Sequence, residues 1–396
     1  MVHRLGIHLL VTAISIVIFG ALGCAPPNNA EVDAGPDEDT NVVDEEPAKF
    51  EAYFTQPQPD EPDESIEEQI IEALQDVPSN AAVRAAFYTF GRDQVAEAFA
   101  QAYDRGVDVQ IVLGNTSTTS TGRPWSAVEI LIDRLGEDRV TICQEGEDEG
   151  GCMGTNIHHN KFITFSELGD GTRDVVLQTS SNMTSAQLEQ FNNMVVAYDD
   201  AALHDAFSQY WDDLRRDERL ASYNREEWGD NDSRVFFFPL SSGDPIMDVL
   251  ERVDCDGGAQ VYLAMAFFTD TRVDVAERLR ELDSQGCGVN IALRERHAIG
   301  SPGDSVLSAL QSGDINFGMF PDNAPVQLHS KYLLVDGSYG RDREERRLIW
   351  TGSHNYTRAA LRDNDEVLLK IDDDTTFEAY LDDWNHIRDR AATVHP

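Results

Sequence analysis

Short apolar runs and amphipathic stretches alternate along most of this chain. Apolar runs over residues 85–89 and 109–113 predict buried strands, and the pattern over 94–103 between them predicts a helix. A turn at Gly106 separates this helix from the second strand. Strand, helix, turn and strand make a βαβ unit, so we expect two parallel neighbouring strands joined by a right-handed crossover.

The same order of elements recurs later, with strands over 265–269 and 289–293 around a helix over 273–282. In this match Phe87-Tyr88-Thr89 aligns with Phe267-Phe268-Thr269. Each copy closes with an acidic helix that carries an Asp-Asp pair beside a tryptophan, over 203–214 and 377–387. We therefore predict a duplicated α/β/α sandwich, whose two halves have mixed sheets, are related by a pseudo-two-fold axis and share a central cleft.

The N-terminus resembles an export signal. An apolar run over 5–19, too short for a membrane span, precedes small residues and Cys24. The Gly-Cys junction resembles a bacterial lipoprotein cleavage site, which implies a lipidated Cys24 at a membrane; Ala21 stands where leucine is usual, so plain secretion is the alternative. The predicted organisation is a signal over 1–24, a disordered acidic tether over 25–49, half 1 over 50–222 and half 2 over 223–396.

The charge balance narrows the range of partners. Lys+Arg total 31 against 72 Asp+Glu, which gives a net charge of −41, and only four of the 31 are lysines. An acid excess with arginine preferred over lysine is typical of proteins that stay soluble in concentrated salt. Such a surface repels polyanions at low salt, so a nucleic-acid partner is disfavoured, and nothing implies a protein partner.

Four cysteines remain beyond Cys24. Cys143 and Cys152 flank an acidic glycine-rich loop, and Cys255 and Cys287 each precede a predicted strand. A disulfide between Cys143 and Cys152 could close the loop that they flank. If the strands after Cys255 and Cys287 are parallel neighbours, a second disulfide is feasible, and both would suit an exported chain. A four-cysteine metal site is the alternative, but the spacing lacks C-x2-C pairs.

Two of the four lysines stand in the same frame, as His159-Asn160-Lys161 and His329-Ser330-Lys331. In a strand this spacing places the histidine and the lysine on one face, where a titratable imidazole and a fixed cation suit a phosphate. Each copy then reaches an apolar strand that ends in Ser-x-Asn, at Ser180 and Asn182 and at Ser353 and Asn355.

The second copy resembles the phospholipase D superfamily in full. His329, Lys331 and Asp336 match its H-x-K-x4-D motif, and Ser353, Asn355 and Glu366 match its G-S-x-N and downstream glutamate. The first copy departs from the pattern, with Ser166 in place of the aspartate and Asn193 in place of the glutamate. The resemblance covers roughly residues 50–390.

The resemblance implies a reaction at phosphorus. One histidine attacks to give a phosphohistidine, the other protonates the leaving alcohol, and lysines and asparagines stabilise the phosphoryl oxygens. Asp336 is expected to orient Lys331 or the local backbone and not to react itself. The implied catalytic residues are His159, Lys161, His329, Lys331, Asp336, Asn182, Asn355 and Glu366, with Ser180 and Ser353 binding substrate and no metal or other cofactor.

The departures bear on which histidine attacks. We expect Glu366 to serve His329, while His159 has only the neutral Asn193, and a carboxylate partner favours a nucleophilic imidazole. That argument favours His329, although two-domain members of the family more often use the N-terminal histidine. The mechanism requires both imidazoles within about 10 Å of each other.

The leading hypothesis is an exported phosphodiesterase that hydrolyses a phospholipid to phosphatidic acid and an alcohol. The alternatives are a nuclease of the same superfamily and a non-catalytic phosphate-binding surface protein, for which the degraded first motif is the main support.

Overall fold

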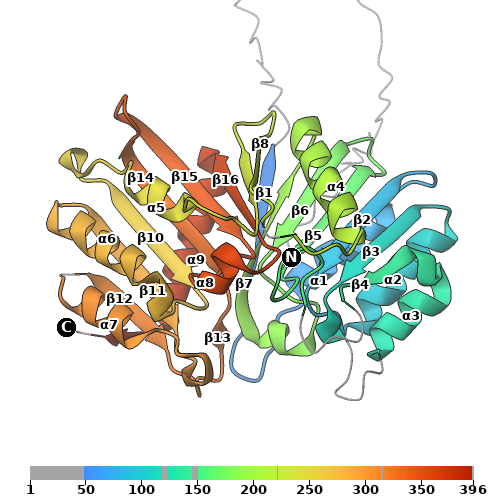
Figure 1. Ribbon diagram of the computed structural model, residues 1–396, viewed down its shortest axis with the longest axis horizontal. Helices are drawn as coiled ribbons and strands as arrows, with labels where there is room; N and C mark the ends of the chain where they lie inside the picture. Colours follow the sequence, from blue (N-terminus) through green and yellow to red (C-terminus); the bar gives the residue numbers. More distant parts are fainter. Residues whose placement is uncertain (1–48, 118–123, 145–149, 221, 314, 395–396) are drawn as a thin grey trace, which may run out of the picture. The chain divides into compact units, whose positions relative to one another are not determined.

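The computed structural model describes residues 49–394, except for 118–123, 145–149, 221 and 314. These residues form two mixed β-sheets (Figure 1). We call β1 to α4 half 1 and β8 to β17 half 2. The predicted signal and the predicted tether, except Lys49, lie outside the described residues. Within those residues no helix has the length and apolarity needed to cross a membrane.

The first sheet has the strand order β1-β7-β6-β5-β2-β3-β4, and β13 of half 2 also pairs with β7. Successive side chains point to opposite faces, so Ala85 packs with helices α1 to α3 while Ala86 packs in the cluster that contains α4. The bounds are β1 (Phe50–Thr55), α1 (Ser65–Asp76), β2 (Ala82–Phe87), α2 (Asp93–Asp104), β3 (Asp108–Leu113), α3 (Ser126–Leu135), β4 (Val140–Ile142), β5 (Lys161–Glu167), β6 (Arg173–Thr179), β7 (Gln190–Ala197) and α4 (Ala201–Arg215).

The second sheet has the order β17-β12-β11-β10-β14-β15-β16-β9-β8, with α5, α6 and α7 packed on one face and α9 on the other. The bounds are β8 (Arg225–Trp228), β9 (Arg234–Phe237), α5 (Pro245–Leu250), β10 (Gln260–Met265), α6 (Val273–Ser284), β11 (Gly288–Arg294), α7 (Asp304–Gln311), β12 (Asn316–Phe320), β13 (Gln327–Leu328), β14 (Lys331–Tyr339), β15 (Glu344–Gly352), α8 (Arg358–Arg362), β16 (Val367–Asp372), α9 (Asp374–Arg390) and β17 (Ala392–Val394).

Aspartate side chains fix where three of these helices begin. Asp200 accepts a hydrogen bond from the backbone N–H of Leu203 at the start of α4, and Asp373 accepts one from Thr376 in α9. Asp244 caps α5 in the same way. Each cap satisfies a backbone donor that has no partner within the helix, which is typically worth about 1 kcal/mol.

The predicted βαβ unit occurs twice, as β2-α2-β3 and β10-α6-β11, and both strand pairs are parallel. The predicted alignment of the copies is wrong by two residues. Phe87 lies opposite Lys161 and Met265 lies opposite Lys331, so Phe87 corresponds to Met265 rather than to Phe267. Both motifs contain aromatic residues in a row, which made the shifted match look better than the true one.

The tryptophans of the closing helices show the same correspondence between the halves. The indole N–H of Trp211 in α4 donates to the carbonyl oxygen of Ala85 at 2.8 Å, and that of Trp384 in α9 donates to the carbonyl oxygen of Leu263 at 3.4 Å. Ala85 and Leu263 stand two residues before Phe87 and Met265, so the two halves repeat this contact.

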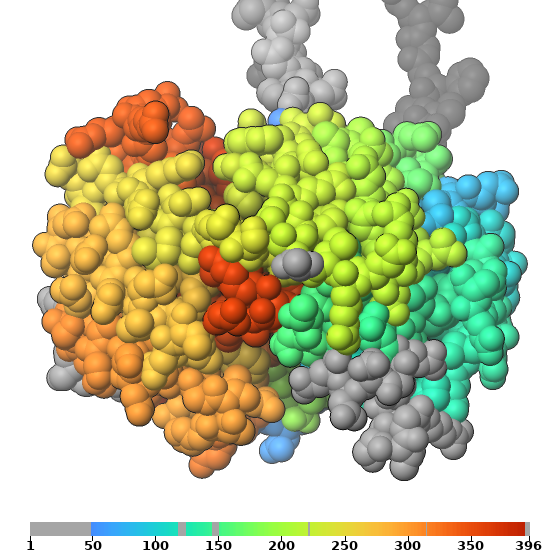
Figure 2. All heavy atoms as spheres, in the orientation of Figure 1, coloured from blue at the N-terminus to red at the C-terminus, as the bar shows by residue number. Residues whose placement is uncertain are grey.

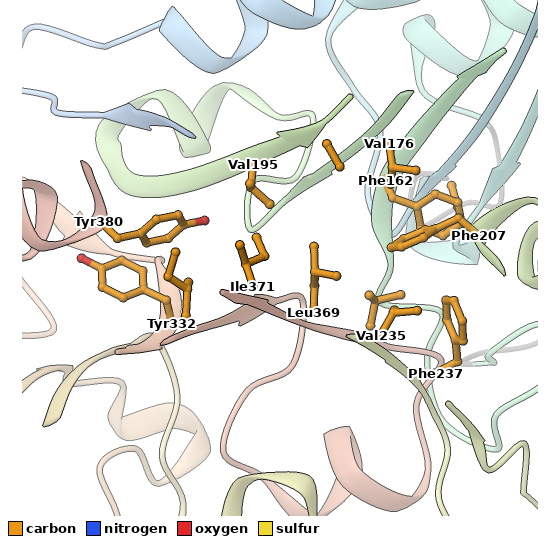
Figure 3. Packing of buried hydrophobic residues seen from close by; sticks show 14 of the residues in the cluster. Phe162, Val176, Val195, Phe207, Val235, Phe237, Tyr332, Leu369, Ile371 and Tyr380 are labelled. Carbon is orange, nitrogen blue, oxygen red and sulfur yellow. The ribbon is translucent and has the colours of Figure 1, made fainter. Parts of the chain in front are cut away.

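One hydrophobic cluster joins the two halves. Figure 3 shows Val176 and Val195 of the first sheet facing Val235, Leu369 and Ile371 of the second. All five side chains are buried, and burying each is worth about 1.5 to 3 kcal/mol. Separation of the halves would expose this cluster, so the junction between them is held by the core itself.

Both expected disulfides are present, Cys143–Cys152 and Cys255–Cys287. The second joins the segments before β10 and β11, whose parallel pairing begins at Gln260 and Gly288. Disulfides are typical of proteins that function outside the reducing cytoplasm.

Removal of the Cys255–Cys287 disulfide should destabilise the fold measurably. The bridge closes a segment of 32 residues, and the loss of that constraint on the unfolded chain corresponds to roughly 3 to 4 kcal/mol. Chemical denaturation of Cys255→Ala/Cys287→Ala, compared with the wild type under oxidising conditions, measures the effect. Equal unfolding free energies would contradict the expectation.

Candidate active site

The structure brings both His-x-Lys pairs to the junction between the halves. Lys161 is the first residue of β5 and Lys331 the first of β14, and each histidine stands two residues before its strand. His159 is 6% exposed and His329 5% exposed, and both lysines are more deeply buried. The site is therefore more enclosed than an open cleft.

Each lysine bends back onto its own histidine. Lys161 Nζ donates to the carbonyl oxygen of His159 at 2.7 Å, and Lys331 Nζ donates to that of His329 at 2.8 Å. The ring of Tyr88 lies 5.0 Å from the ring of His159 and 5.3 Å from Lys161 Nζ. The carbonyl contacts fix the position of each ammonium group beside its imidazole.

The carboxylate of Glu366 serves the histidine of the other half. His159 Nδ1 lies 2.8 Å from Glu366 Oε2, and Ser353 Oγ donates to the same oxygen at 2.5 Å. Asn364 Nδ2 donates to Glu366 Oε1 at 2.9 Å. The expectation that Glu366 pairs with His329 is wrong, because the motif glutamate of half 2 points across the junction.

The equivalent arrangement at His329 contains a neutral amide. His329 Nδ1 lies 3.0 Å from Asn192 Oδ1, and Ser180 Oγ donates to that oxygen at 3.1 Å. Asn192 Nδ2 donates to the backbone oxygens of Gln187 and Gln190, which turns the amide oxygen toward the imidazole. Asn192 is therefore the counterpart of Glu366.

The expectation that Asn193 occupies this position is wrong by one residue. Asn193 Nδ2 donates to Thr351 Oγ1 at 2.7 Å, and its Oδ1 accepts from the backbone N–H of Lys331 at 3.0 Å. Its side chain joins β7 to the strands of half 2 and contacts neither histidine in the described residues. Glu366 follows its motif serine by 13 residues and Asn192 follows Ser180 by 12, so equal spacing pointed to Asn193.

Ser180 and Ser353 hold the residues that orient the histidines, which is a positioning role; their expected contact with substrate stays a prediction. Each hydroxyl oxygen also accepts a hydrogen bond from a backbone N–H of the following strand. The donor is Asn193 for Ser180 and Val367 for Ser353, both at 3.0 Å. The single proton of each hydroxyl is therefore already engaged within the protein.

The asparagines of the Ser-x-Asn motifs remain available to a ligand. Asn182 and Asn355 follow β6 and β15, and neither side-chain oxygen has a partner among the described residues. The predicted role of these amides as donors to a phosphoryl oxygen stays a prediction.

Asp336 does not reach the site. It stands five residues along β14 from Lys331, roughly 16 Å at strand spacing, and Arg347 Nε lies 3.6 Å from its carboxylate. Of the two expected roles, the contact with Lys331 is therefore wrong, and a role at the local backbone stays a prediction. Ser166, at the matching place in half 1, accepts the backbone N–H of Ala82 at 2.9 Å. Both side chains interact with neighbouring strands and not with the histidines or lysines of the site.

A cross-half bridge aligns His159 with Glu366, formed by residues 156–159 and 363–365. The His159 N–H donates to the Asp365 carbonyl at 2.9 Å, and the Asp365 N–H donates to the Ile157 carbonyl at 3.0 Å. The buried carboxylate of Asp365 accepts the N–H of Gly154 at 2.6 Å. Figure 2 shows the red surface of α8 and the following residues against green surface of half 1. Nothing in the motifs signals Asp365.

Burial and mutual repulsion lower the pKa values of the two histidines and the two lysines. The pKa of His159 lies well below its usual value because of burial first and then Lys161 and Lys331; burial, Lys331 and Lys161 lower that of His329 in the same way. Burial lowers the pKa of Lys161 to about 7, and burial and Lys161 lower that of Lys331 well below normal. Burial raises the pKa of Glu366 to about 6. The negative charge near the two lysines does not balance their positive charge, and a bound anion would supply the rest.

The fold and this composite site define a duplicated α/β protein whose histidine and lysine pairs meet between its halves. The family described as "Cardiolipin synthase, PLD-like domain" matches residues 71–215 and 257–388. The chain belongs to this family and thus to the phospholipase D superfamily, whose members act on phosphodiester bonds. No curated protein sequence matches the chain.

Solved structures show the same fold at low sequence identity. Phosphatidylserine synthase from Haemophilus influenzae Rd KW20 matches with a TM-score of 0.59 and 14% identity over 87% of each chain. Polyphosphate kinase from Porphyromonas gingivalis matches with a TM-score of 0.55 and 12% identity over 85% of this chain. The match spans about half of the kinase, 50% of its length. These likenesses extend to the fold alone.

Anion binding at this site should be coupled to proton uptake. At pH 8 Lys161, whose pKa is about 7, is largely deprotonated, and a bound phosphodiester anion raises that pKa, so on the order of one proton should be taken up. Titration calorimetry with dimethyl phosphate in Tris and in HEPES, whose ionisation enthalpies differ, measures this uptake. Lys161→Met should reduce it and Lys370→Met, outside the site, should not. Identical enthalpies in both buffers would contradict the coupling.

Proposed function

We propose that this protein is a phosphodiesterase of the phospholipase D type, which hydrolyses a phospholipid to phosphatidic acid and an alcohol. The observation that carries the proposal is the unequal pairing of the two imidazoles. His159 has the carboxylate of Glu366 and His329 has the neutral amide of Asn192, with a lysine beside each. That combination supplies a nucleophile, an acid and the charge that a phosphodiester requires.

In this proposal His159 is the nucleophile. Its Nδ1–H is held by Glu366, which directs the Nε2 lone pair outward and stabilises the positive charge that develops on attack. The depressed pKa of His159 keeps that lone pair free at neutral pH. The sequence favoured His329 only because Glu366 was expected to contact it, so the same physical reasoning now selects the other histidine.

His329 is the general acid. Its neutral partner Asn192 orients the ring without stabilising the imidazolium, so the proton is released readily. The charge of a bound phosphodiester raises the pKa of His329 and loads it with that proton. Attack by His159 Nε2 forms a P–N bond as the P–O bond to the alcohol breaks, and His329 Nε2 protonates the departing oxygen.

Hydrolysis then reverses these roles. Water attacks phosphorus, gives a proton to His329, and the P–N bond breaks, which restores both imidazoles and leaves the phosphatidic acid. Lys161 and Lys331 offset the charge of the phosphoryl oxygens, and Asn182 and Asn355 donate hydrogen bonds to them. A lipid is favoured over nucleic acid because a chain of net charge −41 repels a strand charged at every nucleotide.

Turnover of defined substrates tests the proposal. Purified protein with a chelator at low ionic strength should release glycerol from phosphatidylglycerol dispersed in a non-ionic detergent and leave single-stranded DNA intact. Glu366→Gln should lower kcat by roughly 10²- to 10⁴-fold, because the imidazole loses the charge that orients and stabilises it. Glu378→Gln, an exposed glutamate of α9 paired with Arg347, is the matched control. Cleavage of DNA alone, or of neither substrate, would reject the proposal.

A substrate whose leaving group needs no protonation distinguishes the roles of the two histidines. A p-nitrophenyl phosphodiester has a leaving group that departs unprotonated near neutral pH, so His329→Ala should still form the phosphoenzyme with it. Stopped-flow absorbance should show a burst of about one nitrophenolate per enzyme followed by a stall. His159→Ala should show no burst. A burst from His159→Ala and none from His329→Ala would reverse the assignment.

A further inference from the structure

Two arginines stand next to the site at the end of β11. Arg294 is 7% exposed, its Nη1 donates to Gln190 Oε1 at 3.2 Å, and its Nε has no partner among the described residues. Arg296 follows on the exposed surface. Gln190 lies two residues before Asn192, so Arg294 is held where β7 approaches His329.

These two guanidinium groups lack the partners that other arginines of the fold have. Neither lies within ion-pair distance of a carboxylate in the described part of the chain, whereas the buried Arg272 pairs with Asp244 at 2.7 Å. Burial and then Arg296 lower the pKa of Arg294 to about 10, and Asp322 only partly offsets them. An uncompensated pair is unexpected in a chain with 72 acidic residues.

Phe267 connects the arginines to the catalytic imidazole. The guanidinium carbons of Arg294 and Arg296 each lie 5.8 Å from the centroid of the Phe267 ring, and that ring lies 6.4 Å from the ring of His329. The positive charge of Arg294 also lowers the pKa of both His329 and Lys331. A row of cationic and aromatic groups thus extends from His329 to the exposed Arg296.

Half 1 cannot carry the same feature. Leu113 lies opposite Phe87 and Leu293 opposite Met265, so Gly114 is the counterpart of Arg294. A Cβ at Gly114 would lie 2.4 Å from the carbonyl oxygen of Tyr88, which leaves room for glycine only. The charge is therefore placed on one side of a site that is otherwise built twice.

We propose that Arg294 and Arg296 form a second anion subsite, which binds a phosphate or carboxylate carried by the leaving alcohol of the substrate. The inference rests on the proposed function, in which His329 protonates the leaving oxygen and so faces that alcohol. An alcohol with its own anionic group, such as a glycerol phosphate, would place that group beyond His329 against the two guanidinium groups. A cationic headgroup such as choline would be repelled there.

Binding of paired phosphate probes tests the subsite without requiring turnover. Calorimetry compares propyl phosphate with α,ω-alkane bisphosphates of two to four carbons. The wild type should bind the best bisphosphate at least tenfold more tightly than propyl phosphate. Arg294→Gln and the exposed Arg296→Gln should each reduce that ratio at least fivefold, and Arg294→Lys should restore part of it.

The control is Arg215→Gln, which removes a charge from the exposed end of α4 and should leave the ratio unchanged. A ratio near one in the wild type, or a ratio unaffected by both subsite variants, would overturn the inference. Failure of the proposed function is recognised separately, by absence of phosphatidylglycerol hydrolysis. In an active protein, cleavage of phosphatidylglycerol phosphate should exceed that of phosphatidylglycerol, and Arg294→Gln should remove the preference.

Discussion

The hydrogen bond between Glu366 of half 2 and His159 of half 1 is the contact on which the site depends. It joins the motif glutamate of one copy to the imidazole of the other, so neither half contains a complete site. The shared cluster of Val176, Val195, Leu369 and Ile371 keeps the two sheets together, and the bridge through Asp365 sets the alignment. The site is thus a product of the packing between the copies.

Because the glutamate of half 2 serves the histidine of half 1, the first motif can lack its carboxylates. Asp336 and Ser166 stand far along their strands and act on local structure, so the loss of an aspartate in half 1 does not touch the chemistry. The glutamate missing from half 1 would have served His329, where Asn192 now stands. The copy that looks degraded therefore holds the histidine with the charged partner. Divergence of the two copies has given each imidazole a different environment.

Local patterns in the sequence were enough to predict the duplicated α/β fold, both βαβ units, the cysteine pairs and the residues of the two His-x-Lys motifs. They could not reveal which half supplies the partner of each histidine, because that depends on packing across the pseudo-two-fold axis. A shift of one residue separates Asn193 from Asn192, and a shift of two misaligned Phe87. Composition reveals neither shift, although a shift of one residue turns a strand side chain to the other face of the sheet and a shift of two moves it along the strand. The lack of a carboxylate partner for Arg294 is likewise evident only in three dimensions.

The central claim is that Glu366 makes His159 the nucleophile. Rapid acid-free quenching during turnover of a ³²P-labelled p-nitrophenyl phosphodiester, followed by peptide mapping of the labelled histidine, tests it most directly. The account predicts label on the peptide that contains His159, accumulating in His329→Ala and absent from His159→Ala. Label on His329 in the wild type would contradict it.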